Sequence, residues 1–283
     1  MGKSKKVNSR EVGLIIAMIL GKHFLGTEDL HYGLWTEDME LKTGNFPLAQ
    51  DKHSKLITDN IPDGVERVLD VGCGAGVLAK KLIALGYHVD CVSPSPLLSE
   101  QVRKNIGPGS TIFESTFEAM DTEGLLGSYD MVLFSESFQY VNLAASFPLI
   151  MKLLKKNGHL MICDFFRKEV EGKSALGGGH RLTRFDAALS ELPLKKLTDI
   201  DITKETAPNM DIVNGFLMNV GLPVRDLIDY YMVNNYPRIT KLLKWKYRKK
   251  LDKLDSKYTA GERNGENFIK FKSYRLFLFQ KTS

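Results

Sequence analysis

One short segment, residues 68–76, limits what this chain can fold into more than any other part of the sequence. An apolar run ends in Asp70 and Val71, glycines stand at positions 72, 74 and 76, and a helical pattern follows. Glycine lets the backbone turn tightly and come close to a ligand, and the start of a helix offers unpaired N–H groups. A strand, a glycine turn and a helix in this order predict a site for a nucleotide-like ligand.

The spacing of these glycines excludes two common nucleotide motifs. A dinucleotide fingerprint, G-x-G-x-x-G, would need its third glycine at position 77, where the chain has Val77. The phosphate-binding loop G-x-x-x-x-G-K-S/T does not occur in the 283 residues. The pattern that remains is G-x-G-x-G, and it does not favour a bound ATP.

Strand-like and helical segments alternate through residues 66–164. We expect strands at 66–71, 87–92, 110–115, 129–134 and 158–164, and helices at 76–86, 95–106 and 143–156. Strands joined by helices of this length give right-handed crossovers and a mostly parallel sheet with helices on both faces. The predicted class is therefore α/β.

The pattern changes in the last third of the chain. We expect a helix at 182–191, a strand at 193–201, a long helical stretch at 210–257 and, after a turn at 261–265, a closing strand at 268–279. Because the closing strand can return to the first sheet, one domain is predicted from residues 46–204 and 261–283. Residues 205–260 are then an inserted helical lid, and residues 1–45 are an N-terminal helical segment that covers the site.

The N-terminal segment superficially copies a signal peptide, because basic residues precede the apolar run 12–20. No small-x-small cleavage pattern follows, and the run is far shorter than the roughly 20 residues that span a bilayer. We expect a helix whose apolar side covers part of the protein. Contact with a membrane interface is the alternative.

Three segments resemble the motifs of class I S-adenosylmethionine-dependent methyltransferases. Residues 70–76 (DVGCGAG) resemble the first motif of that family, residues 130–136 (DMVLFSE) its fourth strand, and residues 153–163 (LLKKNGHLMIC) its turn into strand five. The resemblance covers about residues 60–165 and is nearest to the small-molecule branch with sterol, tocopherol and cyclopropane-forming enzymes (methyltransferase type 11). It implies a Rossmann-like three-layer sandwich of seven strands with an antiparallel last strand.

The resemblance implies S-adenosyl-L-methionine as cofactor and S-adenosyl-L-homocysteine as product. A carboxylate complements an α-ammonium group, so Asp70, with the turn behind it, is expected to hold the methionine end. Ser93 stands where the family usually has an acid for the ribose hydroxyls, and Thr116 and Phe117 fall where the adenine pocket should be. The full expected set is Tyr32, Asp70, Gly72, Cys73, Gly74, Ser93, Pro94, Thr116, Phe117, Ser135 and Glu136.

Residues 30–35 (LHYGLW) resemble an aromatic motif that many small-molecule methyltransferases carry before the cofactor domain. By that resemblance Tyr32 contacts the methionine carboxylate of the cofactor, and His31 or Trp35 lines the acceptor pocket. Gln139 and Tyr140 follow strand four at the edge where ligands of an open sheet gather. Methyl transfer is an in-line displacement, and an acceptor that must lose a proton needs a base, for which His31, Tyr140 and His180 are the candidates.

Composition narrows the setting of the chain. The three cysteines, Cys73, Cys91 and Cys163, form no C-x-x-C pair, so we expect no zinc site, no other metal and no disulfide scaffold, and a cytoplasmic location. The net charge is +5, but residues 238–257 hold nine basic and two acidic residues, a local +7 that leaves −2 for the rest. Leu243, with other apolar residues at helical spacing, gives this stretch an apolar face that we expect to pack on the substrate cavity.

The predicted function is methyl transfer to a small, partly hydrophobic acceptor. Two alternatives stay open: an RNA or lipid methyltransferase that uses the basic stretch 238–257, and a non-catalytic cofactor-binding protein of the same fold. The basic stretch is expected to be a solvated lid helix. The functional alternatives for it are attraction of anionic substrates or of a membrane surface, and RNA ranks last because no aromatic stacking platform accompanies the charges. The acceptor atom and the oligomeric state are not specified by the sequence.

Overall fold

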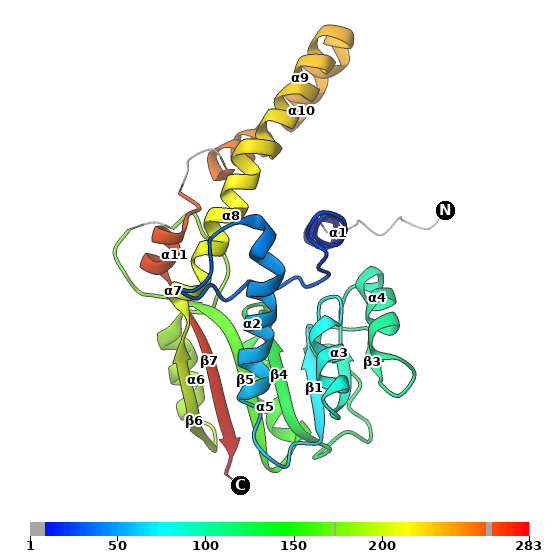
Figure 1. The fold of residues 1–283 in the computed structure, drawn as a ribbon, viewed down its shortest axis with the longest axis vertical. Coiled ribbons are helices and arrows are strands. Elements are labelled where there is room, and N and C mark those ends of the chain that lie inside the picture. The colour runs from blue at the N-terminus through cyan, green and yellow to red at the C-terminus, as the bar shows by residue number, and fades with distance from the viewer. Residues whose placement is uncertain (1–8, 173, 259–261, 283) are drawn as a thin grey trace.

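In the computed structural model, which describes residues 9–172, 174–258 and 262–282, seven strands pair into one sheet in the order β3-β2-β1-β4-β5-β7-β6 (Figure 1). The strands are β1 Arg67–Val71, β2 His88–Val92, β3 Ile112–Phe113, β4 Tyr129–Ser135, β5 Leu154–Arg167, β6 Leu194–Asp201 and β7 Lys272–Lys281. Neighbours from β3 to β5 are parallel, and β7 is antiparallel to both β5 and β6. The predicted α/β class with an antiparallel last strand is confirmed.

Helices cover both faces of this sheet. The α-helices of the described residues are α1 Ser9–Leu20, α2 Phe46–Asp59, α3 Val77–Ala84, α4 Pro96–Ile106, α5 Leu143–Leu153, α6 Leu182–Ser190, α7 Thr203–Thr206, α8 Pro208–Phe216, α9 Leu222–Asn235, α10 Pro237–Tyr258 and α11 Gly265–Phe271. Buried side chains of α2, α3 and α4 pack on one face, and those of α5 and α6 pack on the other. The molecule therefore has the three layers of a Rossmann-like sandwich.

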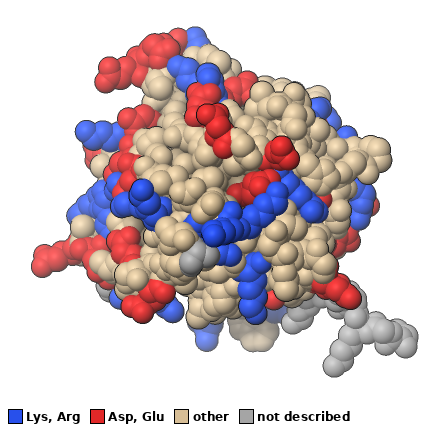
Figure 2. All heavy atoms as spheres, turned by 90° about the horizontal axis from the view of Figure 1, so that it is seen from below, with Lys and Arg blue, Asp and Glu red and all other residues tan. Residues whose placement is uncertain are grey.

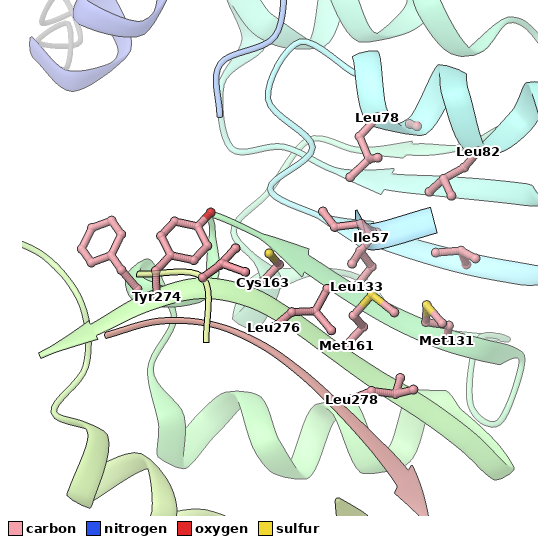
Figure 3. Packing of buried hydrophobic residues seen from close by; sticks show 14 of the residues in the cluster. Ile57, Leu78, Leu82, Met131, Leu133, Met161, Cys163, Tyr274, Leu276 and Leu278 are labelled. Carbon is pink, nitrogen blue, oxygen red and sulfur yellow. The ribbon is translucent and has the colours of Figure 1, made fainter. Parts of the chain in front are cut away.

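The strands supply both cores because successive side chains of a strand point to opposite faces. In β7, Leu276 and Leu278 join the core under α2 and α3, while Phe277 and Phe279 join the core under α5 and α6. Figure 3 shows the first of these cores, with Ile57 of α2 above the sheet. Both faces of β7 are covered, which explains why its sequence is apolar without interruption from 276 to 279.

Three predicted boundaries were wrong, each because tertiary pairing overrides the local pattern. The helix expected at 143–156 ends at Leu153, since Leu154 already pairs with Tyr129 of β4. The strand expected at 110–115 is reduced to two paired residues. The first part of the closing strand expected at 268–279 is helical, because the Asn264 side chain accepts a hydrogen bond from the Asn267 N–H and starts α11.

The described segment between β6 and β7 contains, in order, α7, α8, a π-helical turn at Leu217–Gly221, α9, α10 and α11. In Figure 1, α9 and α10 run side by side away from the sheet. The prediction that the apolar face of 238–257 packs on the substrate cavity is wrong for the described side chains, because Leu243, Tyr247 and Leu251 are all about two fifths exposed. Two further residues of that face, 254 and 258, lie outside the described side chains, as do residues 259–261 of the predicted lid and its turn.

Helix α1 lies above the carboxyl edge of the sheet (Figure 1). The expectation that its apolar side covers the protein is met only in part: Leu14 contributes to the cavity described below, but Val12, Ile16 and Ile19 are exposed. Residues 1–8, which include Lys3, Lys5 and Lys6, and the side chain of Arg10 are outside the described part of the chain. In the described part of the chain, no helix has both the length and the hydropathy needed to cross a bilayer.

Candidate functional site

A cavity of about 520 Å³ opens at the carboxyl ends of β1, β2 and β4. The sheet continues from β1 to β2 and β3 on one side and from β4 to β5 on the other, so the chain reverses its direction of winding between β1 and β4. Ligands of open α/β sheets bind at such a switch point. Of the predicted site residues, those that line it are His31, Tyr32, Asp70, Gly72, Cys73, Gly74, Ser93, Pro94, Ser135, Glu136, Gln139 and Tyr140.

The glycine turn forms one wall of the cavity. Gly72, Gly74 and Gly76 all have positive φ, at 74°, 57° and 79°. A Cβ on Gly72 would overlap the Cβ of Ser137, whereas a Cβ on Gly74 would meet only Leu30, at 3.8 Å. Glycine is therefore required at 72 by both conformation and space, and at 74 by conformation and by its position on the cavity wall.

Replacing Gly72 with alanine is expected to destabilise the fold more than the same change at Gly64. Both glycines have a similar positive φ, but a Cβ on Gly64 meets nothing within 4 Å. The backbone strain that a side chain causes at positive φ is therefore similar in the two variants. The overlap with Ser137 adds about 1–3 kcal/mol to the loss in free energy of unfolding at position 72. Chemical denaturation of the two variants measures the difference, and equal losses would contradict the tight turn.

Asp70 is the most unusual charged group of the cavity. Its side chain is 1% exposed, and its Oδ2 has no hydrogen-bond partner among the described residues. Burial raises the pKa of this carboxyl to about 7, although the nearby His31 opposes the rise. A buried carboxylate without a partner is costly, so this position fits a cationic ligand that brings its own hydrogen-bond donors.

Glu136 lies across the cavity, directly after β4. Its backbone has a φ of 54°, which is uncommon for a residue with a side chain. Its Oε1 accepts hydrogen bonds from the Tyr32 N–H at 2.6 Å and from the Tyr274 hydroxyl at 2.7 Å. Burial raises the pKa of Glu136, although His31 and both hydrogen bonds act in the opposite direction. The two hydrogen bonds fix the position of the carboxylate, and burial raises its pKa above the usual value for a glutamate.

The buried His53 is connected to Glu136 through the hydroxyl of Tyr274. His53 Nε2 lies 2.9 Å from the Tyr274 hydroxyl, which has a single proton and donates it to Glu136. His53 Nε2 must then be the donor to that hydroxyl. Burial, with the charge of His31, lowers the pKa of His53 well below its usual value, so the imidazole is neutral. His53, Tyr274 and Glu136 form one hydrogen-bonded row that ends at the cavity.

His31 lines the cavity, but both of its ring nitrogens are engaged. Nδ1 lies 2.8 Å from the Tyr32 carbonyl oxygen, and Nε2 lies 3.2 Å from both Asp29 Oδ1 and Ser54 Oγ. Burial alone would lower the pKa of His31, but the hydrogen bond and charge of Asp29 outweigh it and raise the pKa. This arrangement fits an imidazolium that balances nearby carboxylates better than it fits a free base.

Gln139 and Tyr140 lie at the mouth of the cavity. The backbone N–H and the side-chain amide of Gln139 both donate to the Asp164 carboxylate, at 2.9 and 3.3 Å. Burial raises the pKa of Asp164 to about 8. Tyr140 is 58% exposed. Gln139 is therefore held in one orientation, whereas Tyr140 stands at the solvent boundary.

Four predicted site residues do not line the cavity. His180 Nε2 lies 3.0 Å from the carbonyl oxygen of Phe138, whose ring it meets edge-on. Trp35 is buried and donates from Nε1 to Asn209 at 3.2 Å. Phe117 packs in the core on the far side of the sheet, and Thr116 is exposed at the turn that precedes it. Their predicted roles stay predictions.

The sequence reading missed several residues that line the cavity, among them Glu28, Asp29, Ser95, Ser137 and Phe165. One of them carried a readable signal: Ser95 caps α4 by accepting a hydrogen bond from the Leu98 N–H, as expected for a serine before Pro96. Among the described residues, no group of three or more His, Cys, Asp or Glu side chains gathers as a metal site.

The sequence is similar to known methyltransferases over part of its length. Residues 68–158 match a family model described as a methyltransferase domain. The ubiquinone biosynthesis O-methyltransferase of Rickettsia conorii is 28% identical over 145 residues, which is 46% of this chain and 49% of that protein. The match thus spans about half the length of this curated relative.

Solved structures resemble the chain over nearly its whole length at low sequence identity. The geranyl diphosphate C-methyltransferase of Streptomyces coelicolor, 14% identical, has a TM-score of 0.66 and covers 98% of this chain and 100% of its own. A 4+2 cyclase, also 14% identical, has a TM-score of 0.69 and covers 96% of this chain and 93% of its own. These likenesses establish the fold, and the cyclase shows that the fold hosts more than one chemistry.

Proposed function

Because this chain carries a class I S-adenosylmethionine-dependent methyltransferase domain, we propose that it transfers a methyl group to a small acceptor molecule. The observation that carries the proposal is Asp70, a buried carboxylate with an unpaired Oδ2, beside the glycine turn of Gly72 and Gly74. The α-ammonium group of S-adenosylmethionine supplies both the charge and the hydrogen-bond donors that this carboxylate lacks. The residues present therefore fit the cofactor.

The remaining binding roles follow from the walls of the cavity. Ser135 Oγ is a second buried polar atom without a partner among the described residues, and it lies on the same cavity as Asp70. We assign the ribose hydroxyls to Ser93, which lines the cavity beyond the end of β2. The cofactor, when bound, supplies an activated methyl group on sulfur. The chain itself supplies orientation and excludes water from that group.

Glu136 is the group that we assign to the acceptor. It lines the cavity, its pKa is raised toward neutral, and its position is fixed by two hydrogen bonds. A carboxylate with these properties can take a proton from a hydroxyl, an amine or an acidic carbon as it is methylated. Tyr32 and Phe165, stacked at 6.2 Å, add an apolar wall that suits a partly hydrophobic acceptor.

A panel of acceptors tests the proposal. The purified chain is incubated with S-adenosylmethionine and with phenols, secondary amines and prenyl diphosphates in turn, and the formation of S-adenosylhomocysteine is measured. Turnover with one class identifies the acceptor atom, and a Gly74→Leu variant, which fills the cavity wall, serves as the inactive control. Tight binding of the cofactor with no turnover on any class would favour the second candidate.

The second candidate is a cofactor-binding protein that does not transfer the methyl group. The similarity to a 4+2 cyclase is the observation that favours it. Under this alternative Asp70 still binds the cofactor, but the chain transfers no methyl group, so Glu136 has no acceptor to deprotonate. Cofactor that stays bound and unreacted after prolonged incubation with every acceptor class would support it.

Cofactor affinity is expected to depend on pH through Asp70. The carboxyl has a pKa of about 7 in the free protein, so it is protonated below pH 7 and must lose that proton to pair with an ammonium group. The affinity for S-adenosylhomocysteine should rise about tenfold per pH unit up to pH 7 and then level off. Calorimetry at pH 6 in two buffers that differ in ionisation enthalpy should show release of nearly one proton per bound ligand. An affinity that is flat from pH 5.5 to 7 would contradict the pairing.

A further inference from the structure

We propose that the hairpin formed by α9 and α10 docks on an anionic lipid bilayer. The hairpin, residues 222–252 in the part whose side chains are described, projects from the sheet in Figure 1 and contributes no residue to the cavity. The proposal does not depend on the reaction, because it rests on a surface that the site does not use.

The hairpin exposes an unusual amount of apolar surface. Leu227, Leu242 and Trp245 are 67%, 60% and 74% exposed. Other exposed apolar or aromatic side chains on the same two helices are Val224, Ile228, Tyr230, Tyr231, Val233, Ile239, Leu243, Tyr247 and Leu251. So many large apolar side chains on one projecting pair of helices are uncommon at a surface that faces water, and they indicate an interaction site.

The charge on the same hairpin selects the partner. Residues 222–252 hold eight basic and three acidic residues, a net charge of +5. Two such hairpins repel each other, which argues against a second copy of this chain as the occupant. Aliphatic side chains such as Leu227 and Leu242 have no counterpart on a nucleic acid backbone, but they insert between lipids while lysines meet anionic headgroups. The mixture of aliphatic, aromatic and basic side chains therefore favours a bilayer surface.

The hairpin is held together well enough to act as one unit. The Thr240 hydroxyl donates to the carbonyl oxygens of Met232 at 2.8 Å and Tyr236 at 2.9 Å, and Lys244 pairs with Asp229 at 2.7 Å. These contacts cross between the two helices and their connection. In contrast, the opposite end of the molecule, seen in Figure 2, mixes basic and acidic side chains. An anionic partner is therefore attracted more strongly to the hairpin, with its net charge of +5, than to the opposite end, where the charges are mixed.

Tryptophan fluorescence of the full chain is the primary test. The chain has two tryptophans; Trp35 is 6% exposed, whereas Trp245 is 74% exposed on the hairpin. Vesicles of equal parts phosphatidylcholine and phosphatidylglycerol should shift the emission to shorter wavelength, because Trp245 leaves water. The Trp245→Phe variant, which keeps Trp35, should show no shift. Absence of a shift in the wild-type chain, together with absence of co-sedimentation, would overturn the proposal.

Matched variants separate lipid docking from general stickiness. Lys249→Gln with Lys250→Gln should weaken vesicle binding about fivefold for each neutralised side chain, whereas the same charge loss at Lys104 and Lys195 should leave it unchanged. Leu242→Ser should weaken binding, and Leu126→Ser, at an equally exposed leucine off the hairpin, should not. Equal binding to pure phosphatidylcholine would overturn the anionic requirement. Salt-sensitive binding of RNA without binding of vesicles would overturn the proposal in favour of RNA. Self-association that buries Trp245 would overturn it in favour of a second copy of the chain.

Discussion

Replacing Asp70 with asparagine is expected to weaken the binding of S-adenosylhomocysteine about 30- to 5,000-fold. The exchange removes a buried charge that would pair with the α-ammonium group, and loss of one partner of such a pair costs about 2–5 kcal/mol. Asparagine has nearly the same shape, so the glycine turn and the cavity remain. Calorimetry with the purified variant gives the change in affinity.

The same variant is expected to be more stable than the wild type at pH 8. Burial raises the Asp70 pKa from 3.8 to about 7, so the folded state binds the proton more tightly than the unfolded state does. Wild-type stability therefore falls as the pH rises from about 4 to 7, and asparagine removes this loss of about 2–4 kcal/mol. Chemical denaturation at pH 8 and at pH 4.5 measures the free energy of unfolding, and the variant should be more stable than the wild type only at pH 8.

Asp164→Asn is the control for this prediction. Asp164 is also buried, and its pKa is raised to about 8, but it bonds to Gln139 and does not line the cavity. Its exchange should leave the affinity for S-adenosylhomocysteine within about threefold. If Asp70→Asn also left that affinity unchanged, Asp70 would not be the cofactor carboxylate.

Replacing Glu136 with glutamine is expected to lower kcat about 100- to 10,000-fold on the acceptor that the panel identifies, if that acceptor loses a proton. Glutamine keeps an oxygen that accepts from Tyr32 and Tyr274, so the loop geometry is retained. The affinity for S-adenosylhomocysteine should change only a few-fold. A variant with normal kcat would contradict the assignment of Glu136 to the acceptor.

Tyr274→Phe tests the positioning of Glu136 separately. The Tyr274 hydroxyl lowers the pKa of Glu136 by donating a hydrogen bond, so its removal should raise that pKa further. The acid limb of the kcat profile should then move to higher pH, while activity at high pH is largely retained. A role of Tyr274 in packing alone would lower kcat at every pH without moving the limb.

The fold could be predicted because its signals are local. The turn at 72–76 combines glycines at positive φ with a strand before it and a helix after it, and all of these lie within residues 67–84. The alternation of helices and strands then fixed the class. The wrong boundaries, such as the helix at 265–271, depend on a capping side chain and on strand pairing that the periodicity does not contain.

The site was only partly predictable because it joins distant segments. Glu136 accepts a hydrogen bond from Tyr274 of β7, which is 138 positions away, and Tyr274 contacts His53 of α2, which is 221 positions away. Within the motif at 30–35, Tyr32 was predicted to contact the cofactor, and His31 or Trp35 was predicted to line the acceptor pocket. Its first residues do line the cavity, but the Gly33 N–H bonds to Asn209, and Trp35 turns toward that same side chain.

The hairpin shows a different limit of the sequence. Helical periodicity identified an apolar face that includes Leu243 and Tyr247, and the prediction placed it on the cavity. The structure leaves both residues exposed. A hydrophobic period states which residues share a face, but not what covers that face.

Calorimetric titration with S-adenosylhomocysteine tests the central claim most directly, because it needs no knowledge of the acceptor. One ligand is expected to bind per chain, at least about 30-fold more weakly in Asp70→Asn and with an affinity within about threefold of the wild type in Asp164→Asn. Absence of binding by S-adenosylhomocysteine and S-adenosylmethionine, with binding of NADH in their place, would contradict the central claim.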